Sequence, residues 1–216
     1  MNDDFWKRPP YVPCHDELFG LAVALIPQPR EAPFSLLDIG SGSGAFAALV
    51  ARGFPAARLA LLETDVTLLR AALARLGDAS ERTQAFALDW TEEDLPGRHD
   101  VVSAVLSLHG LDGEDRAALY SAAFDALGRN GVFLLVARIR AATPSVDHAY
   151  RTAWQQQVLG AGGDAALVAE HLADLKVETL GTLADEQAAL AAAGFAEVNC
   201  WYQNLSYALL TGVRPH

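Results

Sequence analysis

Three glycines, Gly40, Gly42 and Gly44, stand together between an apolar run at 35–39 and a helical run that begins at Ala45. Glycine tolerates positive φ angles, and a ligand can come close to its backbone because it has no side chain. The helix that follows presents free N–H groups and a partial positive charge at its N-terminus. This loop is therefore a candidate binding site for a phosphate or a carboxylate group.

The glycine spacing fits two ligand classes. Gly40, Gly42 and Ala45 satisfy the loose dinucleotide pattern G-x-G-x-x-G/A, whereas Gly40, Gly42 and Gly44 satisfy G-x-G-x-G. The glycines alone do not separate the two classes. Asp38 bears on the choice because it stands at the strand end, just before the first glycine. A carboxylate there would repel a pyrophosphate but would suit a cationic ammonium group.

Acidic residues also end the next two apolar runs along the chain. Glu63 follows the run at 58–62, a position where an acid accepts hydrogen bonds from ribose hydroxyls. Asp89 and Trp90 follow the third run, where a carboxylate can bind an adenine amino group and an indole can stack on its ring. Ligands of parallel α/β sheets bind at the carboxyl ends of the strands. We therefore expect these acids and the glycine loop to share one ligand.

Alternating strands and helices must position these residues. Near-continuous apolar strands separated by helices predict a parallel sheet covered on both faces, that is, a doubly wound, Rossmann-like α/β fold. The strands are expected at 35–39, 58–62, 83–88, 101–106 and 132–137, and the helices at 16–26, 45–52, 66–76 and 112–127, the last capped by Asp112.

The last third of the chain has a different pattern. Ala-rich helices are expected at 146–159, 164–172 and 183–193. Two β-type runs at 195–202 and 205–213, joined by Gln203 and Asn204, are too close for a helical crossover and should pair antiparallel. The prediction is a seven-stranded sheet of five parallel strands followed by a C-terminal antiparallel hairpin, with a helical lid.

Four segments resemble motifs of the class I S-adenosylmethionine (SAM)-dependent methyltransferase family, and the resemblance covers nearly the whole chain. D-I-G-S-G-S-G at 38–44 is similar to the first motif, L-L-E-T-D at 61–65 to the second and A-L-D-W at 87–90 to the adenine-binding motif. The segment 100–109 is similar to the fourth strand, which passes under the cofactor. The resemblance implies that SAM is the cofactor, that S-adenosylhomocysteine (SAH) is the product, and that the binding residues are Asp38, Gly40, Ser41, Gly42, Gly44, Glu63, Thr64, Asp89, Trp90 and Leu106.

The sulfonium of SAM makes its methyl group electrophilic, so the protein mainly orients the acceptor and excludes water. A general base is needed only if the nucleophile arrives protonated. His109, just past the fourth strand, is the catalytic candidate; many family members read His-His-Leu where this chain has His109-Gly110-Leu111. Arg138 and Arg140 can bind a substrate carboxylate bidentately. The substrate-binding candidates are Tyr11, His15, Arg138, Tyr150, Trp154 and Tyr202.

Composition limits the partners. The 216 residues hold 16 Lys+Arg against 27 Asp+Glu, a net charge of −11, which opposes binding to nucleic acid or a membrane surface. Two cysteines, Cys14 and Cys200, are too few for a disulfide framework or a zinc site, and no metal is expected. With no signal peptide and no spanning segment evident, the sequence predicts a cytoplasmic protein with a small-molecule substrate; a homodimer is compatible with it.

We expect a single domain, 1–216, made of an N-terminal lid helix (1–34), a cofactor-binding core (35–140), inserted lid helices (141–182), and a last helix with the hairpin (183–216). Its expected function is methyl transfer from SAM to a small molecule. Four alternatives stay open: modification of RNA at a wobble uridine, because 11–16 is similar to a segment of such enzymes; SAM chemistry such as carboxyl transfer or cyclisation; SAM binding without catalysis; and a nicotinamide-dependent oxidoreductase.

Overall fold

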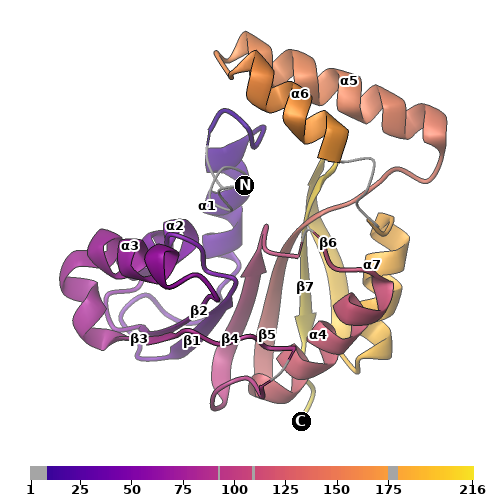
Figure 1. Cartoon of the computed structure of the whole chain (residues 1–216). Coiled ribbons are helices and arrows are strands. Elements are labelled where there is room, and N and C mark those ends of the chain that lie inside the picture. The colour runs from indigo at the N-terminus through magenta and orange to yellow at the C-terminus, as the bar shows by residue number, and fades with distance from the viewer. Residues whose placement is uncertain (1–8, 92, 109, 175–179) are drawn as a thin grey trace.

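A seven-stranded sheet in the order β3-β2-β1-β4-β5-β7-β6 forms the centre of the protein (Figure 1). The computed structural model describes residues 9–216 except residues 92, 109 and 175–179. The strands are β1 (Ser35–Ile39), β2 (Arg58–Leu62), β3 (Thr83–Phe86), β4 (His99–Val105), β5 (Leu127–Arg138), β6 (Ala196–Asn204) and β7 (Tyr207–Val213).

The first five strands are parallel, and β7 joins β5 antiparallel and pairs with β6 in a hairpin. This confirms the predicted fold class. The strand order reverses between β1 and β4, which are direct neighbours with Asp38 opposite Ser103. Such a reversal leaves a crevice at the carboxyl ends of the strands, where ligands of this architecture bind.

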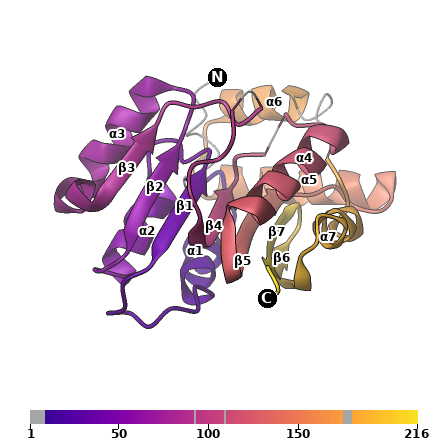
Figure 2. The same ribbon diagram turned by 90° about the horizontal axis from the view of Figure 1, so that it is seen from below.

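Helices cover both faces of the sheet (Figure 2). One face packs against α1 (His15–Ala24), α2 (Ala45–Gly53) and α3 (Val66–Leu76), and the other against α4 (Gly113–Ala126) and α7 (Leu183–Ala192). Consecutive strand residues feed opposite cores: Leu36 belongs to the first and Leu37 to the second. A 3₁₀ segment, Gly77–Arg82, leads from α3 into β3.

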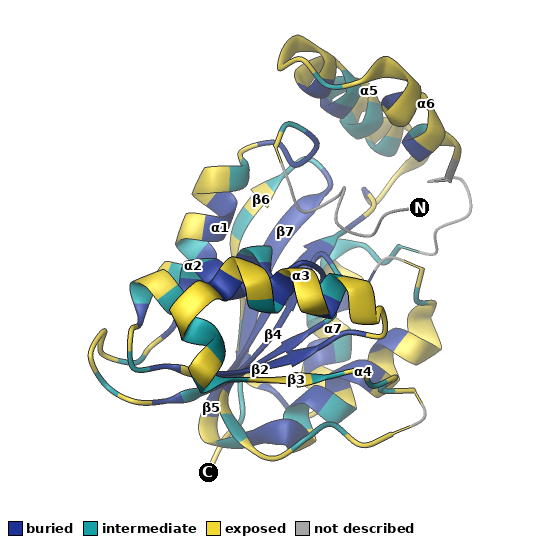
Figure 3. Ribbon diagram, turned by 60° about the vertical axis from the view of Figure 1, so that its left-hand side comes forward, coloured by how far each residue is buried: buried dark blue, intermediate teal, exposed yellow. Residues whose placement is uncertain are grey.

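Two further helices, α5 (Pro144–Gly160) and α6 (Ala165–Asp174), lie across the carboxyl ends of the parallel strands. Their outward faces are exposed, whereas the central strands are buried (Figure 3). Trp154 of α5 connects this helix to the N-terminal segment, since its indole Nε1 donates a 2.9 Å hydrogen bond to the Tyr11 carbonyl. None of the described helices is long and apolar enough to cross a membrane.

Several element boundaries differ from the sequence prediction, most by one to three residues. The third strand ends at Phe86 instead of Leu88, and β5 starts at Leu127 instead of Val132 because Asn130, at φ 58°, is accommodated within the strand. In the hairpin, Asn204 still pairs with Tyr207, so the turn consists of Leu205 and Ser206 and not of Gln203 and Asn204. Leu205 adopts the left-handed conformation at φ 50° that the tight turn requires.

Candidate functional site

The glycine loop between β1 and α2 has the backbone conformation that the sequence predicted. Gly40, Gly42 and Gly44 have φ angles of 64°, 54° and 74°, in the left-handed region. A Cβ atom at Gly40 would lie 2.4 Å from the Cβ of Ser107, just beyond β4, and one at Gly44 would lie 2.8 Å from the Cβ of Ala72 on α3. The loop therefore fits tightly between the end of β4 and α3.

Glu63 joins the end of β2 to this loop. Its side chain is only 6% exposed, and Oε2 accepts a 2.9 Å hydrogen bond from the Gly42 amide. Oε1 accepts from the Asp65 amide at 3.2 Å and from the Thr64 hydroxyl at 3.4 Å. Three hydrogen bonds from neutral donors thus fix the Glu63 side chain beside the loop.

Asp38 is the second buried carboxylate of the site, 1% exposed at the penultimate residue of β1. The Ser103 hydroxyl of β4 donates to its Oδ1 at 2.8 Å. Nearby in the loop, the Ser41 hydroxyl is buried and has no hydrogen-bond partner among the described residues. A buried polar atom in that state is a place where a ligand can supply the missing bond.

Leu106 follows β4 in a strained conformation, with φ at 50° and its amide bonded to the Val136 carbonyl at 2.8 Å. Non-glycine residues in this region are uncommon and cluster at functional sites. The next residue, Ser107, donates from its hydroxyl to the Ile39 carbonyl at 2.7 Å, which joins the ends of β1 and β4. The catalytic candidate, His109, lies outside the described residues, so its role stays a prediction.

The structure places the adenine-binding candidates at an exposed turn beyond β3. Asp89 Oδ1 accepts hydrogen bonds from the Thr91 hydroxyl and amide, at 2.7 and 3.0 Å, and these bonds lower the pKa of its carboxyl. Trp90 is half-buried against the core on the α4 side and lines a surface hollow of about 490 Å³ with residues of α4. A cofactor contact of either residue stays a prediction.

Two of the six substrate-binding candidates, Tyr11 and Trp154, hold α5 and α6 against the N-terminal segment. The Tyr11 carbonyl accepts hydrogen bonds from the Trp154 indole and from the Tyr207 hydroxyl, at 2.9 and 3.1 Å. The Tyr11 hydroxyl in turn accepts from the Asp164 amide at 3.2 Å. Both Tyr11 and Trp154 are buried, so these contacts are structural ones between the N-terminal segment, α5 and β7.

Three more candidates make contacts at α1, at α5 and in the hairpin. His15 stacks on Phe19 with ring centroids 4.3 Å apart and bonds to Asp16. The Tyr202 hydroxyl donates to Glu17 at 3.2 Å. Burial is the largest of the causes that raise the pKa of Tyr202 to about 12. The Tyr150 hydroxyl, on α5, accepts from Gln203 of β6 at 3.3 Å.

Arg138, the last candidate, ends β5 and lines a narrow hollow beside Leu106. The other lining residues are Leu108, Arg116, Val136, Ala137 and Leu180. A larger cavity of about 530 Å³ adjoins it, sharing Arg116 and Leu180. The lining residues of the two hollows come from the ends of β4 and β5, from α4 and α7, and from the segments that follow or precede them.

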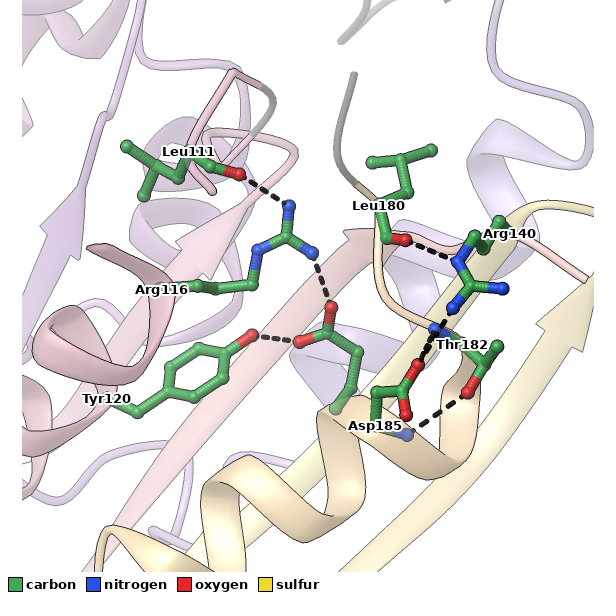
Figure 4. A network of polar contacts seen from close by, with 8 residues as sticks. Leu111, Arg116, Tyr120, Arg140, Leu180, Thr182 and Asp185 are labelled. Carbon is green, nitrogen blue, oxygen red and sulfur yellow. Dashed lines mark hydrogen bonds and ion pairs between the residues drawn. The ribbon is translucent and has the colours of Figure 1, made fainter. Parts of the chain in front are cut away.

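Sequence reasoning missed the buried network beneath these hollows (Figure 4). Arg116 Nη1 of α4 lies 2.5 Å from Glu186 Oε1 of α7, and Nη2 donates to the Leu111 carbonyl at 3.0 Å. The Tyr120 hydroxyl donates to the other Glu186 oxygen. Arg140 is held separately, donating to the Leu180 carbonyl at 2.8 Å and lying 3.4 Å from Asp185. No local pattern marks these pairs, because Arg116 and Glu186 are 70 residues apart.

No group of three or more potential metal ligands comes together in the part of the chain that the structure describes. The site's own chemistry is that of two buried carboxylates, a row of loop amides and a buried hydroxyl. Such a set binds hydroxyl, ammonium and carboxylate groups of an organic ligand.

Comparison with known proteins agrees with this geometry. Residues 37–133, from β1 into β5, match a family model described as a methyltransferase domain. A stretch of 128 residues is 34% identical to trans-aconitate 2-methyltransferase of Methylobacterium radiotolerans, covering 59% of this chain and 47% of that protein. A stretch of 90 residues is 32% identical to ribosomal RNA small subunit methyltransferase H of Leptospira borgpetersenii, covering 42% of this chain and 26% of that protein.

The chain thus spans less than half the length of either curated relative. A solved structure, that of the S-adenosylmethionine-dependent methyltransferase SibL in its apo form, superposes with a TM-score of 0.65 at 23% identity. The match covers 95% of this chain and 60% of that one. At this identity the match establishes a common fold.

Proposed function

We propose that this chain is a SAM-dependent methyltransferase that transfers a methyl group from SAM to a small-molecule acceptor. The match of residues 37–133 to the methyltransferase domain model and the fold shared with a SAM-dependent methyltransferase support this proposal. The observation that carries the proposal is the buried Glu63 carboxylate bonded to the Gly42 amide of the glycine loop. An acid and a glycine loop joined in this way form a preorganised edge for a nucleoside with an amino-acid tail.

The residues present fit SAM group by group. Asp38 would hold the ammonium, the loop amides and Ser41 the carboxylate, Glu63 the ribose hydroxyls, and Asp89 the adenine amino group. Thr64 supports Glu63 through its hydroxyl, and Leu106 forms the floor beyond β4. When bound, SAM supplies a sulfonium-activated methyl group and leaves as SAH.

On the acceptor side, the chain's task is to orient a nucleophile and to exclude water. The hollows next to Leu106 and Arg138, partly covered by Leu180, are where we place the acceptor. Support for a small molecule comes from the net charge of −11 and from the relative named for trans-aconitate. His109 would serve as a base only for an acceptor that arrives protonated.

Titration calorimetry with SAM, SAH and NADH tests the cofactor. We expect SAM and SAH to bind with dissociation constants on the order of micromolar, and NADH to produce no heat of binding. Binding of NADH without binding of SAM or SAH would overturn the proposal. Mass spectrometry of ligand released from the purified protein gives an independent identification.

Methylation of RNA is a second candidate, favoured by the relative named as a ribosomal RNA methyltransferase. Incubating the protein with methyl-labelled SAM and a cell extract separates the two functions. For the small-molecule function, the label enters the fraction that passes a low-mass filter, with a mass increase of one methyl group. Label retained in RNA and lost on ribonuclease treatment would select the second candidate.

A further inference from the structure

Two stretches of chain pack closely at the point where the strand order reverses. They are the start of the glycine loop, after β1, and the residues that leave β4. A Cβ atom placed on Gly40 would lie 2.4 Å from the Cβ of Ser107 and 3.1 Å from its Oγ. The backbone of Gly40 therefore contacts the Ser107 side chain so closely that no other residue type fits at the start of the loop.

The Ser107 side chain also bonds to the last residue of β1. Its hydroxyl donates a 2.7 Å hydrogen bond to the carbonyl of Ile39, the residue immediately before Gly40. The backbone that places Ser107 there is strained, because the preceding residue, Leu106, has a φ of 50°. A non-glycine residue keeps such a conformation only where its surroundings hold it. The strained turn at Leu106 thus places a hydroxyl at the base of the glycine loop.

The glycine loop is held from two sides. On the β2 side, the Gly42 amide donates to the Glu63 carboxylate at 2.9 Å. On the β4 side, the contact is Ser107. Between these two contacts lies Ser41, whose buried hydroxyl we assign to the carboxylate of the amino-acid tail of SAM. Ser107 therefore fixes the part of the loop that we assign to the tail, whereas Glu63 serves both the loop and the ribose.

We propose that Ser107 is a positioning residue for the amino-acid tail of SAM. Its hydroxyl and its contact with Gly40 hold the start of the glycine loop in the conformation that binds the tail. This inference rests on the proposed function and adds a residue that acts through the loop. A loop that is already ordered loses less conformational entropy when its ligand binds. Removing the Ser107 hydroxyl should therefore weaken ligands that carry the tail and spare ligands that lack it.

Titration calorimetry with two ligands tests this inference. SAH carries the amino-acid tail, whereas 5′-methylthioadenosine keeps the adenosine and the sulfur atom and lacks the tail. We expect Ser107→Ala to weaken SAH binding roughly threefold to tenfold, which corresponds to the loss of one hydrogen bond, and to change 5′-methylthioadenosine binding less than about twofold. Equal losses for the two ligands, or an unchanged affinity for SAH, would overturn the inference.

Ser35→Ala is the matched control, because Ser35 also joins β1 to β4 but at the opposite end of β1. Its hydroxyl donates to the Asp100 carboxylate of β4 at 3.0 Å. If serine served only to hold these two strands together, Ser35→Ala and Ser107→Ala would behave alike. We expect Ser35→Ala to bind both ligands as the unaltered protein does. A loss of SAH affinity in Ser35→Ala as large as that in Ser107→Ala would contradict a role specific to the loop.

Hydrogen exchange of the free protein gives a second readout, which needs no ligand. Mass spectrometry of peptic peptides measures exchange of the amides at 39–44, which should be faster in Ser107→Ala and normal in Ser35→Ala. Equal exchange in the two variants would contradict the inference even where 5′-methylthioadenosine binds too weakly to be titrated. Ser107→Cys keeps the size of the side chain with a weaker donor and should show the same effects, so it replaces Ser107→Ala if that variant does not fold.

Failure of this inference can be told apart from failure of the proposed function. The SAH titration of the unaltered protein is recorded first, and absence of SAH binding contradicts the proposed function. If SAH binds, but Ser107→Ala leaves the ratio of the two ligand affinities unchanged, only the positioning role of Ser107 is contradicted.

Discussion

The backbone amide of Gly42 donates a 2.9 Å hydrogen bond to Oε2 of Glu63, so that the acid at the end of β2 and the loop after β1 form a single unit. The same carboxylate that we expect to bind the ribose also fixes the loop that we expect to bind the amino-acid tail. We therefore expect substitution of Glu63 to weaken binding of the amino-acid tail of SAM as well as binding of its ribose.

Glu63→Gln should weaken SAH binding about tenfold or more, since a hydrogen bond to a charged group is worth roughly 1.5–3 kcal/mol. Calorimetry measures the change. Glu81→Gln, an exposed acid in the segment before β3, is the control and should bind SAH normally. An affinity for SAH unchanged in Glu63→Gln would contradict the assignment of this edge as the cofactor site.

Asp38→Ala should likewise weaken SAH binding while far-ultraviolet circular dichroism stays that of the unaltered protein. The reason is the loss of the carboxylate that we assign to the ammonium group. Ser103→Ala is the companion variant, because Ser103 donates to Asp38 at 2.8 Å and helps to orient it. Its loss of affinity should be smaller; a larger loss than in Asp38→Ala would show that the serine, and not the acid, carries the effect.

Substituting alanine at two glycines should have opposite effects on stability. Gly40→Ala places a Cβ 2.4 Å from that of Ser107 at a φ of 64°, which should cost about 1–3 kcal/mol and abolish SAH binding. Gly20→Ala lies inside α1, where the new Cβ meets no atom within 4 Å, and should gain about 0.5–1 kcal/mol. Urea unfolding monitored by fluorescence gives both values. A stable Gly40→Ala protein with normal binding would show that the loop tolerates a side chain.

The buried pair of Arg116 and Glu186 should behave as a coupled unit. Glu186→Met leaves the Arg116 charge buried without its partner and should cost about 3–5 kcal/mol. Arg116→Met combined with Glu186→Met removes both charges and should recover a large part of that loss. Urea unfolding of the two single variants and the double variant forms the cycle. If the loss of unfolding free energy in the double variant equals the sum of the losses in the two single variants, Arg116 and Glu186 are not coupled.

Alkaline pH should destabilise the fold through Tyr120. Burial is the main cause that raises the pKa of its hydroxyl, and the Glu186 carboxylate adds to it. Because the folded pKa is higher than the ordinary value near 10, the stabilisation is complete below pH 10 and is lost as the pH rises above it. The unfolding free energy should fall with a slope approaching about 1.4 kcal/mol per pH unit.

Unfolding in urea between pH 8 and 11 measures this slope, and Tyr120→Phe should reduce it. Tyr202→Phe is the comparison: the pKa of Tyr202 is raised to about 12, so it acts between pH 10 and about 12, but its side chain is far more exposed and its share should be small. If the unfolding free energy of Tyr120→Phe falls with pH as steeply as that of the unaltered protein, another group causes the loss of stability at alkaline pH.

Local patterns were enough to predict most elements of the fold. The strand at 58–62 and the helix at 66–76 end where the sequence indicated, because Asp65 caps the helix through the Thr67 amide and Gly77 follows its last residue. The predicted position of the hairpin turn was wrong by two residues. Asn204 is the better turn former by type, yet the pairing of Asn204 with Tyr207 fixed the register and forced Leu205 into the turn.

Only those site residues that neighbouring residues in the sequence identify could be predicted. The glycine loop and Glu63 are of this kind, because each directly follows an apolar run that predicts a strand. Trp154 and Arg116 could not be placed in this way, because their partners, Tyr11 and Glu186, are 143 and 70 residues away and no spacing relates them. Trp154 is buried and bonded to the N-terminal segment, and a substrate contact of this residue stays a prediction.

The Tyr11 carbonyl bonds to side chains 143 and 196 residues further along the chain. Closing such long loops is the slow part of folding. Both hydrogen bonds to the Tyr11 carbonyl can form only after Tyr207, near the end of the given sequence, has been synthesised. The contact that joins the N-terminal segment to α5 and β7 is therefore completed late in synthesis.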